Sequence, residues 1–413
     1  MRHSIGIRSA ALAAAALASV CTQAEGFDPI VGALSEAKPI FDTRLRYEGV
    51  EQNPMAEEAD AVTLRARLGF ETGKAWETAL LVEGDLVWPL SSHYNSTTNG
   101  ETQYPVVADP ESYEFNRLQL VNTALPGTTL TLGRQRIVLD DHRFVGNVGW
   151  RQNEQTFDAL RVVNKTVANL TVDVSYVQQV NRIYGKESSQ GRYEGENLLA
   201  NVSYQLPVGK LTGYAYRIEI DPIASVPAAV RDSSATYGLR FAGERPLSKI
   251  KLAYAAAYAT QQEAGDNPLS FDNDYYLLEL TGTYRQFSLG AGVEVLEGNG
   301  VKGFTTPLAT LHKFQGWADK FLTTPPNGLE DRYATAGVTL KAVGKFDTLG
   351  FVVAYHDYDA ERVAADYGSE WDASIAAKLK RFNFLLKYAA YEEGELASAR
   401  TTDKLWVQLE FIL

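Results

Sequence analysis

The stretch LRARLGFE (residues 64–71) alternates apolar and other side chains, and both of its basic residues, Arg65 and Arg67, fall on the same side of the alternation. Successive side chains of a β-strand point to opposite faces, so this pattern predicts a strand with one apolar and one cationic face. The stretch FDTRLRYEG (residues 41–49) repeats the rhythm with two further arginines. Both stretches predict strands whose polar face does not belong in an apolar protein core.

The first 24 residues combine a basic start, an apolar run and small residues, which is the pattern of a secretory signal peptide. We expect a leader at residues 1–24 and one exported domain at residues 25–413. The only cysteine, Cys21, lies in this leader, so the exported chain would form no disulfide. A lipoprotein modification at Cys21 is the alternative, and the bulky Val20 before it argues against this. The net charge of −12 argues against a nucleic-acid partner.

The chain after the leader has no run of 18 apolar residues, which predicts that it has no transmembrane helix. An exported protein can still cross a membrane as a closed barrel. Trp76 and Trp88 end an apolar face that alternates with Glu83 and Asp85. The two tryptophans would stand roughly 30 Å apart along a barrel axis, near the height of a membrane's apolar band. A soluble β-sandwich would show the same alternation.

The lengths of the connections separate these two alternatives. Short links such as ETGKAW and QLPVGK alternate with long polar segments such as residues 91–110 and 297–330. Outer-membrane barrels have this asymmetry of short periplasmic turns and long extracellular loops. The sequence therefore predicts an all-β fold, a transmembrane antiparallel β-barrel of about 18 strands. The strands are expected to begin near Lys38, Ala61, Trp76, Tyr113, Thr128, Gln155, Asn169, Glu196, Lys210, Ser234, Ser248, Asp274, Gln286, Asp331, Lys345, Glu370, Phe382 and Thr402.

Basic side chains on these strands are expected to face the lumen, because a cation at the lipid midplane costs about 2–4 kcal/mol. A first hairpin turning at Pro54 and Met55 is expected to place Arg44 opposite Arg67, and Arg46 opposite Arg65. The predicted lining residues are Arg44, Arg46, Arg65, Arg67, Arg117, Arg134, Arg136, Arg217, Arg240, Lys378, Lys387, Glu83 and Asp85.

Like charges across a strand pair repel, so the arginines need either neighbouring acids or an anionic passenger. Glu83 and Asp85 share their side of the wall by the same alternation. One interpretation is a solvated network of ion pairs. The other is a row of weak sites for carboxylates, which fit the planar fork of a guanidinium group.

Within residues 310–321, apolar side chains recur at helical spacing between prolines, which predicts a short helix in an extracellular loop. We expect this segment to fold over or into the barrel mouth as a constriction. An irregular loop packed on its neighbours is the alternative.

Two segments, LGRQRIVLDDHRFVGNVGWRQNEQTFDALRV (residues 132–162) and FTTPLATLHKFQGWADKFLTTPPNGLEDRY (residues 304–333), resemble the alginate-export family of outer-membrane porins. The resemblance implies a monomeric barrel of 18 strands whose arginine-rich constriction passes an acidic polysaccharide, and it supports Arg117 as a lumen residue. The motif GRQR (Gly133–Arg136) also matches the family. Its strand phase would send both arginines into lipid unless Gly133 forms a bulge, and we expect that bulge.

The expected function is a channel for anionic solutes in the outer membrane of a Gram-negative bacterium. The alternatives are a general or differently selective porin, and a surface receptor or adhesin barrel. No nucleophile and base stand at a recognisable spacing, so we expect no enzyme activity and no cofactor. The expected partners are outer-membrane lipid and lipopolysaccharide, an anionic solute or polysaccharide, the barrel-assembly machinery and periplasmic delivery proteins.

Overall fold

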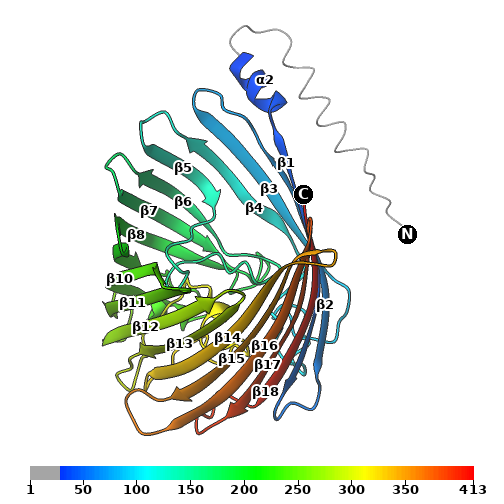
Figure 1. The fold of residues 1–413 in the computed structure, drawn as a ribbon, viewed down its shortest axis with the longest axis vertical. Helices are drawn as coiled ribbons and strands as arrows, with labels where there is room; N and C mark the ends of the chain where they lie inside the picture. The colour runs from blue at the N-terminus through cyan, green and yellow to red at the C-terminus, as the bar shows by residue number, and fades with distance from the viewer. Residues whose placement is uncertain (1–27) are drawn as a thin grey trace.

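The computed structural model describes residues 28–413, and these form one closed antiparallel barrel (Figure 1). Each of the 18 strands pairs with its neighbours along the chain, and the last strand returns to pair with the first. Closure removes free sheet edges, as a membrane-spanning sheet requires. The predicted fold class is confirmed. The predicted leader and Cys21 lie outside the described residues.

The strand starts agree with the predicted ones to within four residues. The strands are β1 (Lys38–Gln52), β2 (Ala59–Glu71), β3 (Thr78–Pro89), β4 (Ser112–Asn122), β5 (Thr128–Gln135), β6 (Thr156–Asn164), β7 (Leu170–Asn181), β8 (Arg192–Leu206), β9 (Gly209–Ile218), β10 (Ser234–Leu247), β11 (Ile250–Glu263), β12 (Asp272–Tyr284), β13 (Phe287–Leu296), β14 (Leu329–Val343), β15 (Phe346–Asp359), β16 (Asp366–Leu379), β17 (Phe382–Glu393) and β18 (Thr402–Ile412). Within residues 28–413, helical structure is limited to α2 (Asp28–Ser35) and the short 3-10 turns η1 (Ala229–Asp232) and η2 (Leu311–Lys313). In the described chain, no helix has the length and apolar character needed to span a membrane.

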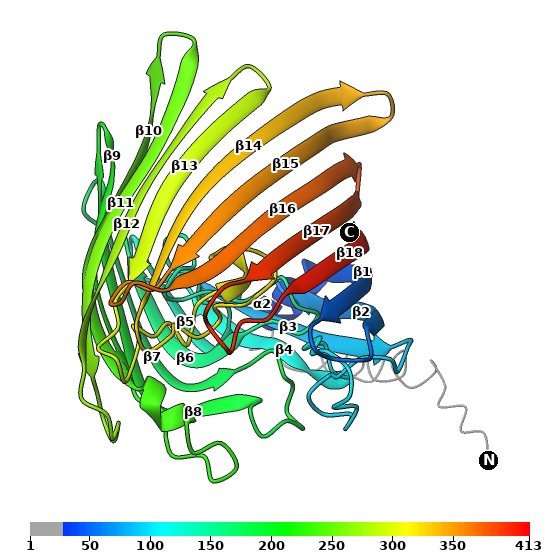
Figure 2. The same cartoon turned by 90° about the horizontal axis from the view of Figure 1, so that it is seen from below.

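The outer face of the barrel is apolar. Side chains such as Leu132, Leu239 and Leu289 are more than half exposed in the isolated chain, and many others like them follow the same alternation. A soluble protein rarely exposes so much contiguous apolar surface. Figure 2 shows β10 to β18 as one tilted, curved wall, the shape that carries such a band around a membrane barrel.

Two loops fill much of the interior, residues 136–155 between β5 and β6 and residues 297–328 between β13 and β14; we call them the lumen loops. They lie within the ring of strands in Figure 1. A backbone hydrogen bond connects the two loops. The N–H of Gly146 donates to the carbonyl of Leu308 at 2.8 Å, next to a parallel bridge between Val145 and Leu308. The buried rings of Tyr275 and Phe304 both contact Phe144. The interior therefore contains a packed apolar core.

The predicted helix over residues 310–321 is wrong. Only the 3-10 turn Leu311–Lys313 forms, and the rest of the segment is irregular and packs on its neighbours. Gly316 explains the interruption, because its φ of +74° lies in the left-handed region. A Cβ there would also collide with the carboxyl group of Glu370 and the hydroxyl of Tyr358, so the segment is shaped by the wall it touches.

The predicted register of the first hairpin is also wrong. Arg44 lies opposite Arg65, Asp42 opposite Arg67, and Arg46 opposite Thr63. The hairpin is centred between Pro54 and Met55, and strand residues equidistant from that centre must pair. The predicted partners of Arg44 and Arg46 therefore lie two residues closer to the C-terminal end of β2 than the observed partners. The observed register relieves repulsion, because a carboxylate stands opposite one of the four arginines.

Candidate functional site

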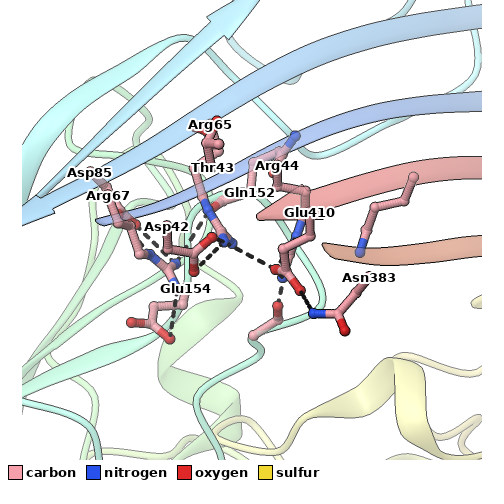
Figure 3. Close-up of polar contacts among 12 residues, drawn as sticks. Asp42, Thr43, Arg44, Arg65, Arg67, Asp85, Gln152, Glu154, Asn383 and Glu410 are labelled. Carbon is pink, nitrogen blue, oxygen red and sulfur yellow. Dashed lines mark hydrogen bonds and ion pairs between the residues drawn. The ribbon is translucent and has the colours of Figure 1, made fainter. Parts of the chain in front are cut away.

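A basic wall is formed by two neighbouring strands, with Arg44 and Arg46 from β1 and Arg65 and Arg67 from β2. All four side chains point into the lumen, and Figure 3 shows three of them converging with their partners. They are 9% or less exposed. A side chain that water does not reach cannot contact a solute that passes through the lumen. The role of these arginines therefore depends on the protein groups that surround them.

Each of the four arginines has a carboxylate partner, and that of Arg46 is Asp109, at 3.7 Å. Nη2 of Arg44 lies 2.8 Å from Oε1 of Glu410 in β18, and Nε of Arg67 lies 2.6 Å from Oδ1 of Asp85 in β3. Arg65 lies 2.6 Å from Asp42, which Figure 3 shows between the strands. Ion pairs that are this short and buried are held in place and desolvated together. The basic wall is therefore a structural network of ion pairs. The sequence interpretation expected such a network to be solvated, whereas this one is buried.

The remaining donors of the basic wall hold the first lumen loop. Nη1 of Arg44 donates to the carbonyl oxygens of Gly149, Trp150 and Arg151 at 3.2, 3.1 and 3.3 Å. Nη2 of Arg46 donates to the carbonyl of Trp150 at 2.6 Å, and its guanidinium lies 4.1 Å from the centre of the Trp150 ring. These contacts satisfy carbonyl groups that a buried irregular segment cannot pair by itself.

A second ionic group surrounds Glu83 of β3. Its carboxylate lies 2.6 Å from Arg117, and the amide of Asn116 donates to it at 2.7 Å. Arg136 joins this carboxylate to Glu154 of the first lumen loop, at 3.4 and 2.5 Å. Burial alone would raise the pKa of Glu154, but Arg67 and Arg136 outweigh it and lower the pKa to about 2.

The expected bulge at Gly133 is not found. The pairing of β5 with β4 and β6 continues through this residue without a shift, although its φ is +109°. Arg134 therefore stays in phase with the exposed Leu132, on the outer face opposite Leu118. Asp158 at 2.7 Å neutralises it there. Arg136 follows the last residue of β5 and turns inward, free of the strand phase.

The extra residue lies instead in β4, where the register against β3 shifts between Glu83 and Gly84. Because of this shift, Asn116 and Arg117, although consecutive, both reach the carboxylate of Glu83. A bulge re-aims side chains in this way.

The prediction that Arg217 faces the lumen is wrong. Its partner on β8 is Leu198, which is exposed on the outer face, and its side chain pairs with Glu219. The residues that face inward on β9 are Tyr214 and Tyr216, both buried against Phe144 of the first lumen loop. The interior of the barrel at this strand is an apolar core, so tyrosine side chains face inward here and the arginine faces outward.

The remaining predicted bases face the lumen. Arg240 lies 3.0 Å from Asp141 of the first lumen loop. Lys378 is exposed toward the inside, near the periplasmic end of β16. Lys387 is buried, and its Nζ lies 2.7 Å from Nε2 of His312 in the second lumen loop.

Around Lys387 lies a cluster of aromatic rings that the sequence interpretation missed. Its ammonium group stands 4.3 Å from the centre of the Trp150 ring and 3.8 Å from that of Trp317. The other nitrogen of His312 contacts Asp319 at 2.7 Å, and burial lowers the pKa of this histidine to about 3. Cation–aromatic contacts of this kind gain strength when desolvated. The cluster fastens both lumen loops to β17 and β18.

Carboxylates of β13 and β16 also hold the lumen loops. Glu294 of β13 lies 2.6 Å from Arg143 of the first lumen loop. Glu370 of β16 accepts the backbone N–H groups of Trp317 and Ala318, the latter at 2.7 Å. Charged partners on two sides of the lumen therefore fix the loops as one unit.

A cavity of about 380 Å³ remains between the lumen loops and the extracellular ends of β1 and β18; we call it the vestibule cavity. Four cations line it, against a single carboxylate, Asp319. Two of these cations, Arg182 and Lys320, have no carboxylate within ion-pair distance in the described chain. The other two, Arg151 and Lys404, share Asp319 at 3.4 and 2.9 Å, and Arg151 also lies 2.8 Å from the buried Glu48 and 3.7 Å from the buried Asp109. The cavity is electropositive.

The sequence did contain a signal for these missed residues. Large apolar side chains occur in both segments that the sequence analysis treated as polar connections: Phe144, Val145 and Trp150 in one, and Leu308, Phe314 and Trp317 in the other. A solvated loop gains nothing from them, so they indicate a loop that packs against something.

The comparisons with known proteins bear on this arrangement. Residues 117–268 match the family model described as alginate export, which confirms the predicted resemblance over that segment. No curated protein sequence matches the chain. Three of the solved structures that match come from Pseudomonas aeruginosa. OccK3 (OpdO) is 14% identical with a TM-score of 0.68, covering 95% of this chain and 99% of its own. OpdL is 17% identical with a TM-score of 0.67, covering 92% and 99%.

A structure of OpdK with vanillate is 14% identical with a TM-score of 0.67, covering 92% of this chain and 100% of its own. Identities this low establish the fold. The chain has the porin fold, and the apolar outer face and the family match agree with it. The predicted location in the outer membrane of a Gram-negative bacterium is confirmed.

Proposed function

We propose that this barrel is a channel for anionic solutes, carboxylates in particular, and that the vestibule cavity is where they are selected. The observation that carries the proposal is the excess of cations around that cavity, with Arg182 and Lys320 free of carboxylate partners among the described residues. A free guanidinium or ammonium group in a partly dry site attracts anions more strongly than one in open water.

The size of the cavity supports a small solute, or one unit of a polymer at a time. Its volume of about 380 Å³ falls near the lower end of the range for small-molecule sites. Apolar side chains such as Val106, Leu311 and Leu322 line it beside the cations. This combination suits an acid with an apolar body, and vanillate, which OpdK holds, is such an acid.

The basic wall takes a supporting role in this proposal. Its arginines hold the first lumen loop in place and so shape the cavity from below. They act on the solute through the loop, while Arg182 and Lys320 contact it.

Replacing both free cations, Arg182→Gln with Lys320→Gln, is expected to lower the anion preference of the channel. Two positive charges leave the cavity, so anions lose an attraction of roughly 1 kcal/mol for each. Reversal potentials in a KCl gradient across planar bilayers measure the preference, and small carboxylates and acidic oligosaccharides serve as blockers. The control is Lys165→Gln, which removes a charge from the exposed turn between β6 and β7.

An unchanged reversal potential in the double variant would overturn the role of the cavity. Block by oligosaccharides alone would favour a polymer cargo, and block by small carboxylates alone would favour a monomeric one. A pure barrel that conducts no ions would overturn the channel itself and favour the surface-receptor alternative.

The anion preference is also expected to fall as the pH rises. Burial, together with the neighbouring Lys404, lowers the pKa of Lys320 to about 8. A lysine is charged below its pKa and neutral above it, so the cavity loses this charge between about pH 7 and about pH 9. Reversal potentials over that range should show the change in the unaltered protein. In Lys320→Gln this part of the pH dependence should vanish, and its persistence would assign the titration to another group.

A further inference from the structure

The barrel wall is low at β5 and β6. These strands have 8 and 9 residues, whereas their neighbours β4 and β7 have 11 and 12. The chain leaves β5 early because the first lumen loop turns inward. As a result β5 pairs with β4 only over Leu118–Asn122. The extracellular half of β4, residues 112–117, has no strand partner on that side in the described chain.

A cavity of about 420 Å³ opens at this gap; we call it the wall notch. On one side stand Tyr113 and Phe115 of β4, which are 44% and 59% exposed on the outer face. On the other side stand Lys186, in the loop between β7 and β8, and Arg192, at the start of β8. Arg134 forms the floor, where its Nη1 donates to the carbonyl of Phe115 at 3.1 Å.

The charges of the wall notch are positive and partly free. Arg134 is neutralised by Asp158. The side chain of Arg192 makes no hydrogen bond or ion pair among residues 28–413, and Lys186 reaches only its neighbour Glu187, at 4.0 Å. Glu114 is the single carboxylate in the lining. The wall notch thus places Arg192, without a polar partner among the described residues, and the weakly paired Lys186 beside two exposed aromatic rings.

We propose that the wall notch binds a phosphorylated glycolipid of the outer leaflet. Both β4 and β8 begin at long extracellular loops, so the notch lies at the level of the outer-leaflet headgroups. Lys186 and Arg192 contact the phosphate, as basic pockets on membrane proteins contact lipid headgroups. Tyr113 and Phe115 pack along the start of an acyl chain, at the depth where aromatic residues gather on such barrels.

Charge complementarity favours this occupant over an ordinary lipid contact. An aromatic girdle alone needs no cations, and surface cations alone need no exposed rings. The wall notch brings both together beside an unpaired strand edge, and a lipid that covers this edge shields backbone groups that would otherwise face the membrane.

The test uses the full chain, purified in detergent and examined by native mass spectrometry with lipid A carrying two phosphates. The double variant Lys186→Gln with Arg192→Gln is expected to weaken retention of lipid A by roughly thirtyfold, since each cation contributes about fivefold. The matched control is Arg217→Gln, an outward arginine near the extracellular end of β9, outside the notch. It is expected to retain lipid A like the unaltered protein.

Two further probes identify the chemistry. Dephosphorylated lipid A is expected to bind weakly to the unaltered protein and equally weakly to the double variant. Inorganic phosphate at millimolar concentration is expected to leave bound lipid A in place, because it lacks the acyl chain that the aromatic residues hold. Equal retention of lipid A by the double variant and the control overturns the proposal. Displacement by inorganic phosphate also overturns it, in favour of a site for free anions.

Discussion

Deletion of residues 310–321 is expected to raise the single-channel conductance by roughly twofold or more, because conductance follows the open cross-section of the pore. This segment carries η2, His312 and Trp317 and lies across the lumen between the basic wall and Glu370. Its removal also takes away the partner of Lys387. Single-channel recording in planar bilayers measures the change.

The control for this deletion is removal of residues 221–228 from the loop between β9 and β10. That segment is mostly exposed and forms no part of the vestibule cavity. Its conductance should equal that of the unaltered barrel. If deletion of residues 310–321 leaves both conductance and ion selectivity unchanged, the second lumen loop does not constrict the pore.

Replacing Arg44 and Arg46 together by serine is expected to release the first lumen loop. Four hydrogen bonds to the carbonyls of residues 149–151 disappear, as does the contact between Arg46 and the ring of Trp150. A buried hydrogen bond to a charged group contributes about 1.5–3 kcal/mol, so the free energy that docks the loop falls by several kcal/mol. We expect noisy, larger conductance steps and faster proteolysis within residues 136–155.

Arg117→Ser is the matched control, since this arginine also pairs with a wall carboxylate, and none of its hydrogen bonds or ion pairs within residues 28–413 reaches a lumen loop. It should keep quiet conductance and resistance to proteolysis. Loop behaviour that is the same in both variants would show that the basic wall is not what holds the loop.

The strands were predictable because their signals are local. Alternation along LRARLGFE and the contrast between short and long connections depend only on residues near one another in the chain. The register of the first hairpin can be obtained by counting residues from its centre. The arginines of β1 and β2 face the lumen because a cation on the outer face would contact lipid. Bulge position was harder, because the extra residue lies in β4 while the glycine that suggested it lies in β5.

The contents of the lumen could not be predicted, because they depend on loops that meet only in three dimensions. The assumption of a water-filled interior placed Arg217 inward, whereas the inward side chains beside it are Tyr214 and Tyr216, which pack on Phe144. Trp150 was left in a polar loop, and His312 and Lys320 in a segment expected to fold over the mouth as a helix, whereas all three line the vestibule cavity. Resemblance to the alginate-export family marked both lumen-loop segments, yet gave no partner for any of their side chains.

The ion pairs of the basic wall also bear on the order of assembly. Arg44 meets Glu410, and Arg46 meets Gln408, across the seam where the first strand joins the last. The second lumen loop meets the same seam through Lys404 and Asp319. Until β18 arrives beside β1, neither loop has its full set of anchors, so an unfinished barrel is both open along its side and unobstructed through its middle. Pairing of β18 with β1 therefore closes the barrel and also completes the contacts that hold both lumen loops.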